Sequence, residues 1–155
     1  MSGWANAFHR QAVEDFKALL SMNPYRAPST YCMLIQMVFE KLVKAALTKS
    51  RGDKPLDYKH KVIRIFMNQH LRANNQSMIF AKKPRVIDFA LKLEDGLPTT
   101  KQRTSPQLEY PWEDPNNNVH CPADDFLLAK RMTDPRDRIR VDVINFLRAF
   151  IKHNP

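Results

Sequence analysis

The fold is decided by residues 28–52, PSTYCMLIQMVFEKLVKAALTKSRG. Between Tyr31 and Leu47 this stretch leaves few polar positions. A helix that is apolar nearly all round is usually the central helix of a bundle, because every face of it must be covered. The segment Pro28-Ser29-Thr30 offers an N-cap just before the apolar run, and Gly52 suits the position just past the helix end. The stretch therefore predicts one long, buried, central helix.

Apolar residues recur at helical spacing on both sides of this stretch. The predicted helices cover about residues 4–22, 58–72, 86–93 and 135–153. Asn23-Pro24 ends the first of them and Gly96 closes the short one. Asp134-Pro135 predicts an N-cap followed by proline in the first turn of the last helix.

The segment from Leu97 to Thr133 is predicted to be irregular, because five prolines interrupt it. Asn116-Asn117-Asn118 suggests the tip of a turn, and Tyr110 and Trp112 are expected to anchor the segment to the body. Only three glycines occur in the chain, which argues against an all-β fold rich in tight turns. We therefore expect one all-α domain spanning residues 1–155, a bundle of about five helices with one long irregular loop before the last helix.

The charge of the chain is strongly basic and unevenly distributed. The formal net charge is +9, yet residues 104–129 contain no Lys or Arg and five acidic residues. A basic body of this kind suggests a polyanionic partner such as nucleic acid, or serves solubility alone. The acidic, proline-rich segment offers a separate docking surface for a protein.

The two cysteines and the N-terminal residues bear on the compartment. Cys32 falls in the apolar run, and two cysteines do not make a disulfide framework, so a reducing compartment is expected. No signal peptide is visible, and no stretch approaches the roughly 18 apolar residues of a membrane span. The expected location is the cytoplasm, without membrane association.

The central stretch resembles a known helical family. Gln36, Glu40-Lys41 and Lys44-Ala45, followed after a short Gly/Pro-containing loop by His60, are similar to the pattern of HEPN domains, helical nucleotide-binding or ribonuclease-like domains. The likeness covers roughly residues 5–72. It implies a helical domain that binds nucleotide or RNA, commonly as a homodimer or beside a nucleotidyltransferase. Without the resemblance, the polar residues spaced by four would be interpreted as the solvated face of a buried helix.

The family resemblance also implies where catalysis would lie. HEPN ribonucleases typically use an Arg and a His four to six residues apart, without a metal. Arg148 and His153 on the last helix fit this spacing, as do Arg64 and His70 on the third, and we prefer the first pair. The Arg would stabilise charge on the phosphodiester while the His transfers a proton. Chance also produces such spacings, and His153 alone is a favourable cation at a helix end.

Two further groups of residues are candidate binding sites. His60, Arg64 and Asn68 are spaced by four, so they form one row along the predicted helix. The row either binds a phosphate or a base edge, with Lys44 as a further contact, or is simply a solvated helix face. His120-Cys121 with Asp124 and Asp125 lacks the spacing of a zinc site. We therefore expect neither a metal nor a cofactor.

Three functions remain open from the sequence. The first is a non-catalytic module that binds nucleotide or RNA, as partner of a nucleotidyltransferase or of a defence system. The second is a metal-independent ribonuclease, such as the toxin of a toxin–antitoxin pair. The third is a protein-interaction module without a nucleic-acid role, which docks through the acidic segment.

Overall fold

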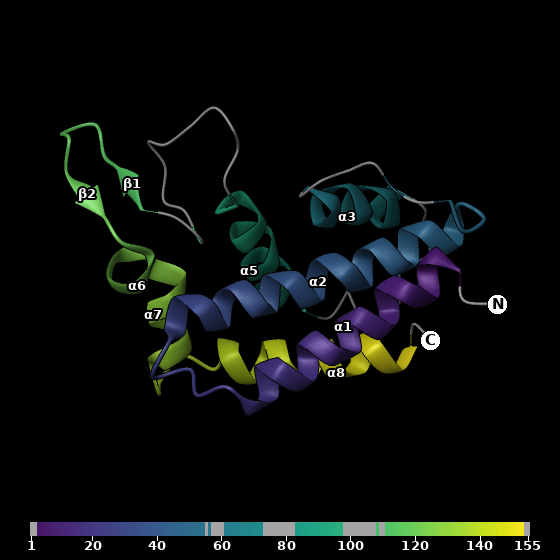
Figure 1. Ribbon diagram of the computed structural model, residues 1–155, viewed down its shortest axis with the longest axis horizontal. Coiled ribbons are helices and arrows are strands. Elements are labelled where there is room, and N and C mark those ends of the chain that lie inside the picture. Colours follow the sequence, from purple (N-terminus) through teal and green to yellow (C-terminus); the bar gives the residue numbers. More distant parts are fainter. Residues whose placement is uncertain are drawn as a thin grey trace.

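The computed structural model describes residues 3–54, 56, 61–72, 83–97, 108 and 111–153 (Figure 1). Within these ranges the chain forms seven helices and one small two-stranded sheet. The all-α fold class predicted from the sequence is therefore confirmed, and all five predicted helices are present. None of the helices in the described ranges has the length and apolar character needed to cross a bilayer.

The first two helices, α1 (Trp4–Ser21) and α2 (Pro28–Ser50), form an antiparallel hairpin along the molecule (Figure 1). The turn between them contains Asn23-Pro24, as predicted. The start of α2 differs from the prediction, because Ser29 and Thr30 lie inside the helix and no side chain caps it. Pro28 opens the helix instead, since its missing N–H would have no partner in the first turn.

The centre of the bundle is α2, as its apolar composition predicts. Figure 1 shows α1 and α8 (Ile139–His153) along one side of α2, and α3 (Val62–Arg72) and α5 (Pro84–Asp95) along the other. Phe39 of α2 stacks on Phe146 of α8 with ring centroids 5.7 Å apart. The apolar side chains of α2 and α8 thus lie mostly within the chain's own core: Ile35, Val38, Phe39, Leu42, Val43, Leu47, Ile139, Val143, Phe146, Leu147 and Phe150.

A buried carboxylate joins α3 to α5. Glu94, only 1 % exposed, accepts the backbone N–H of Ile63 at 2.6 Å and that of Arg64 at 3.1 Å. These N–H groups belong to the first turn of α3, which has no intrahelical acceptor for them. Burial raises the pKa of the Glu94 carboxyl, and the two hydrogen bonds oppose that rise. Glu94 therefore fixes the end of α5 against the start of α3.

The expected irregular segment has more regular structure than its prolines suggested. β1 (Trp112–Glu113) and β2 (Val119–His120) form an antiparallel hairpin, followed by α6 (Pro122–Asp125) and α7 (Leu127–Thr133). Asn117 at the tip has a φ of 63°, so the predicted turn is confirmed. Trp112 is buried as expected, whereas Tyr110 lies outside the described residues. The prediction of irregular structure through Thr133 is wrong, because Pro122 opens a helical turn rather than breaking one.

The last helix begins later than predicted. α8 starts at Ile139, not at Pro135. Asp134 accepts the N–H of Arg136 and so closes a turn, while Asp137 accepts the N–H of Ile139 at 2.9 Å and caps the helix. The predicted cap, Asp134, lies three residues before Asp137, which caps the helix in the structure.

Candidate nucleic-acid interface

The preferred catalytic pair lies on the last turns of α8. Arg148 is exposed and donates from Nη1 to Asn145 Oδ1 at 3.2 Å, within its own helix. His153 is also exposed, and α8 stays helical through it. Residues five apart on a regular helix point about 140° away from each other. His153 could lie beside Arg148 only if the helix were bent, and the described part of α8 has no such bend.

The alternative pair on α3 is placed differently. The Arg64 Nη2 atom lies 2.8 Å and 2.9 Å from the two carboxylate oxygens of Asp95, so its guanidinium is engaged with α5. Asn68 is exposed on the same helix. His60 and the side chain of His70 lie outside the described residues. The structure thus gives Arg64 a role in holding α3 to α5.

The polar residues spaced by four along α2, namely Gln36, Glu40 and Lys44, are more buried than the residues of a solvated helix face. Gln36 is 1 % exposed, and neither its amide nitrogen nor its oxygen has a hydrogen-bond partner in the described structure. An unpaired buried amide lowers stability by about 1–3 kcal/mol. Lys44 pairs with Glu40 at 2.5 Å and lies 5.9 Å from the centre of the Phe8 ring. The interpretation as a solvated face is wrong for Gln36, and Lys44 is largely covered.

Basic side chains gather where α2 and α8 end, a region we call the basic end. Exposed residues of this region come from the last turn of α2, the loop after it and the last turn of α8: Lys49, Arg51, Lys54, Lys152 and His153. Asp53 is the single acid in residues 49–54. Figure 1 places the end of α2, the start of α1 and the end of α8 on the same side of the molecule.

Two contacts hold the basic end together. The Asp53 carboxylate accepts the N–H groups of Trp4 and Ala5 at 3.0 Å and 2.8 Å, which caps α1. His9 of α1 places its Nε2 3.1 Å from the carbonyl oxygen of Ile151, in the last turn of α8. The start of α1 therefore lies beside both the α2 loop and the end of α8.

The turn after α2 depends on left-handed backbone. Gly52 has a φ of 70° and Asp53 a φ of 63°. Glycine takes this conformation without steric cost, and aspartate tolerates it better than most residues. The predicted role of Gly52 past the helix end is confirmed. The turn also aims the Asp53 carboxylate back at α1.

Single cations near helix C-termini are ordinary, because they favour the negative end of the helix dipole. Here the ends of α2 and α8 lie on the same side of the molecule, and the start of α1 contacts the loop after α2 through Asp53 and the end of α8 through His9 (Figure 1). The cations of the two helix ends therefore lie at the same end of the molecule. A phosphate backbone is the common biological partner of such a surface.

The opposite end of the molecule carries the acidic hairpin, residues 111–125 (Figure 1). Asp114 accepts three hydrogen bonds, two of them from the side chain and backbone of Asn118, and these hold the pKa of its carboxyl well below the ordinary value. The ring nitrogens of His120 lie 3.3 Å from Asp114 and 3.4 Å from Asp125. Within the described ranges, no three His, Cys, Asp or Glu side chains converge as metal ligands.

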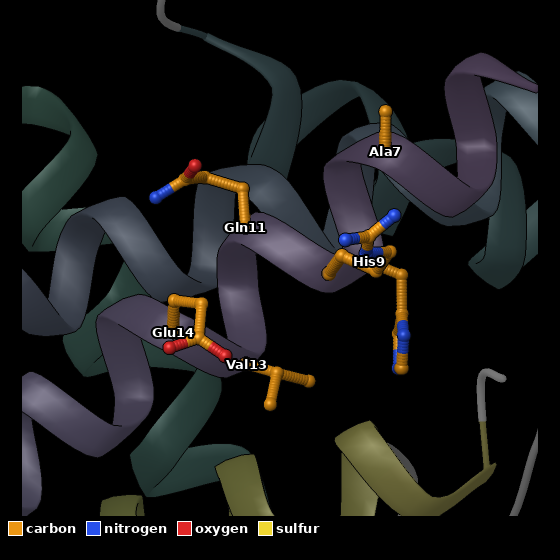
Figure 2. Close-up of a pocket in the computed structure, with 6 residues that line it drawn as sticks. Ala7, His9, Gln11, Val13 and Glu14 are labelled. Carbon is orange, nitrogen blue, oxygen red and sulfur yellow. The ribbon is translucent and has the colours of Figure 1, made fainter. Parts of the chain in front are cut away.

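An open groove of about 650 Å³ lies beside α1. Figure 2 shows residues that line it. His9 and Val13 point from α1 toward α8, whereas Gln11 and Ala7 lie on the other side of the helix. Arg10 and Glu14, which also line the groove, carry opposite charges. This local charge balance gives the groove no evident preference for an anion, so the basic end is the better candidate interface.

The sequence did not single out the basic end as a site. In sequence, residues 51–54 indicate only a loop, and Trp4 is simply the first residue of a predicted helix. The alternation of Lys49, Arg51 and Lys54 around a glycine was the available signal, but nothing in it pointed to the end of α8.

Comparison with protein-family models, with curated proteins and with solved structures gives no match to this chain.

Proposed function

We propose that this chain is a HEPN-like helical domain that binds RNA or a nucleotide in the cytoplasm without cleaving it. The basic end carries the proposal. Lys49, Arg51, Lys54 and Lys152 are exposed at the ends of α2 and α8, and Asp53 is the one acid among residues 49–54. Cations grouped in this way neutralise successive phosphates and release the counterions bound to them. A nucleotidyltransferase or a defence system is the partner that the family resemblance favours.

The positions of the catalytic candidates support binding rather than cleavage. Arg64 is engaged with Asp95, and Arg148 and His153 point away from each other on a regular helix. A general acid or base must reach the reacting oxygen while the arginine contacts the same phosphate. Within one chain, Arg148 and His153 do not have a geometry suited to that task, and the guanidinium of Arg64 is already paired.

The separation of charge along the molecule also supports an oriented complex. The acidic hairpin lies at the end of the molecule opposite to the basic end (Figure 1). A polyanion is attracted to one end and repelled from the other, which favours one orientation during encounter. The hairpin would then stay available for a protein partner.

Binding to RNA is expected to weaken steeply with salt. Four or five phosphate contacts to a single strand give a slope of about −3 for log affinity against log salt concentration. Fluorescence anisotropy of a labelled 12-nucleotide RNA, measured between about 50 and 300 mM NaCl, gives this slope. No binding at the lowest salt would refute the proposal and favour a plain protein-interaction module.

A ribonuclease remains the second candidate because Arg148 and His153 are both exposed near the basic end. A homodimer that joined these helix ends would bring Arg148 of one copy near His153 of the other. Incubation of the same labelled RNA with chelator present separates the two functions. Intact RNA after hours supports the binding module, whereas shortened RNA that depends on His153 establishes the ribonuclease.

A further inference from the structure

Trp4 is a large aromatic side chain that the core does not use. It is 55 % exposed and stands at the first position of α1. Its backbone N–H donates to Asp53, in the loop between the basic residues Arg51 and Lys54. Tryptophan is enriched at interfaces relative to the rest of a protein surface.

The backbone that carries the indole is held firmly. Asp53 caps both Trp4 and Ala5, and Gly3 leaves room for that carboxylate, since a Cβ at Gly3 would lie 2.0 Å from Asp53 Oδ2. The Trp4 ring lies 6.4 Å from the ring of Phe8, centroid to centroid, at a tilt of 37°. An aromatic group fixed in this way loses little side-chain freedom on binding a ligand.

Tyr25 provides a contrast within the same chain. It is similarly exposed, at 58 %, but the Arg140 guanidinium covers its ring at 5.1 Å and also donates to its hydroxyl. Trp4 and Tyr25 stand at opposite ends of α1, because Tyr25 follows the last turn. Among the described residues, one exposed aromatic residue thus stands beside the basic loop, and another is already engaged with an arginine.

We propose that Trp4 is a stacking platform for a base of single-stranded RNA or DNA, an inference that rests on the nucleic-acid binding proposed above. Proteins that bind single strands combine cations along the backbone with aromatic rings on which bases stack. Arg51 and Lys54 supply the cations here, in the same loop that caps the start of α1. The bases of a duplex are stacked on one another, so a single strand is the ligand that this surface fits.

The test compares an oligonucleotide that carries bases with an abasic strand of the same length, which has the same phosphates. Wild type is expected to bind the base-bearing strand at least fivefold more tightly. Trp4→Ala should lose this preference, and Trp4→Phe should keep most of it. Tyr25→Ala, which removes a ring of similar exposure, should leave the preference unchanged. Equal affinity of wild type for both strands, or an unchanged preference in Trp4→Ala, would overturn the proposal.

Fluorescence reports the same contact directly. Trp4 and Trp112 are the two tryptophans, so Trp112→Phe leaves Trp4 as the reporter. Stacked bases should quench its emission, whereas the abasic strand should not, and oligo-uridine and oligo-thymidine arms separate RNA from DNA. Salt-sensitive binding without quenching would reject the Trp4 inference and leave the proposed function standing. Absence of binding to every strand would reject both.

Discussion

Reversing three charges at the basic end is expected to lower RNA affinity about 100-fold at 0.1 M salt. The variant carries Lys49→Glu, Arg51→Glu and Lys54→Glu, all at exposed positions after or within the last turn of α2. Each lost phosphate contact to a single strand also reduces the salt slope by about 0.7 unit. The neutral variant, with Gln at the same three positions, should lose about tenfold. Anisotropy titrations measure both, and thermal melts verify that each variant is folded.

A matched control changes the same number of charges elsewhere. Lys83, Lys130 and Arg136 are exposed and lie near the start of α8, at the other end of that helix. Salt screens charges beyond about 10 Å at 0.1 M, so their reversal to Glu should cost less than about fivefold in affinity. Equal losses in the two triple variants would mean that net charge, and not the basic end, governs binding.

Asp137→Ala is expected to lower the free energy of unfolding by about 2 kcal/mol. The Asp137 carboxylate accepts the N–H of Ile139, binds Arg131 Nε at 2.7 Å and lies 3.3 Å from Arg85 Nη2. It therefore joins the start of α8 to α7 and α5. Removing the Asp137 carboxylate leaves the half-buried Arg131 guanidinium and the Ile139 N–H at the start of α8 without their partner. Urea denaturation measures the loss.

The same residue predicts how stability depends on pH. The Arg131 hydrogen bond, supported by the Ile139 N–H and by nearby positive charge, lowers the pKa of the Asp137 carboxyl below its ordinary 3.8. Because the folded pKa is the lower one, this stabilisation is complete above about pH 4 and is lost as pH falls through the folded value. Asp137→Asn should therefore show a weaker loss of stability below pH 4 than wild type.

The control for Asp137 is Asp88→Asn. Asp88 pairs with Lys92 at 2.9 Å, but both side chains are more than half exposed. Such surface pairs contribute at most about 1 kcal/mol, so the free energy of unfolding should hardly change. Losses of the same size in the Asp88 and Asp137 variants would contradict the special role given to Asp137.

Much of the fold could be predicted from the sequence because periodicity reports the core. The apolar run from Tyr31 to Leu47 placed α2 at the centre, and Gly52 marked its end. The predicted start of α8 was too early, because Asp134 and Asp137 can both cap a helix and Asp137 is the one that does so. The short helices α6 and α7 were missed, since their stability comes from packing residues such as Ala129 and Met132 into the core and not from their own periodicity.

The candidate interface could not be predicted in the same way. Its members come from the start of α1, the loop after α2 and the end of α8, segments that only the folded chain brings together. The spacing of Arg148 and His153 was visible in the sequence, but their directions depend on whether α8 stays regular to its end. Glu40 and Lys44 stand four residues apart on α2, so their ion pair follows from the spacing. The contact of Lys44 with the Phe8 ring depends instead on how α1 packs on α2.

The most direct measurement of the central claim is a map of the residues that RNA contacts. Amide and indole resonances of the ¹⁵N-labelled protein, followed during titration with a 12-nucleotide RNA, give such a map. We expect the largest changes at the Trp4 indole and at the amides of residues 49–54 and 151–153, with residues 112–125 unchanged. Changes concentrated in residues 112–125, or none in residues 49–54, would contradict the assignment of nucleic-acid binding to the basic end.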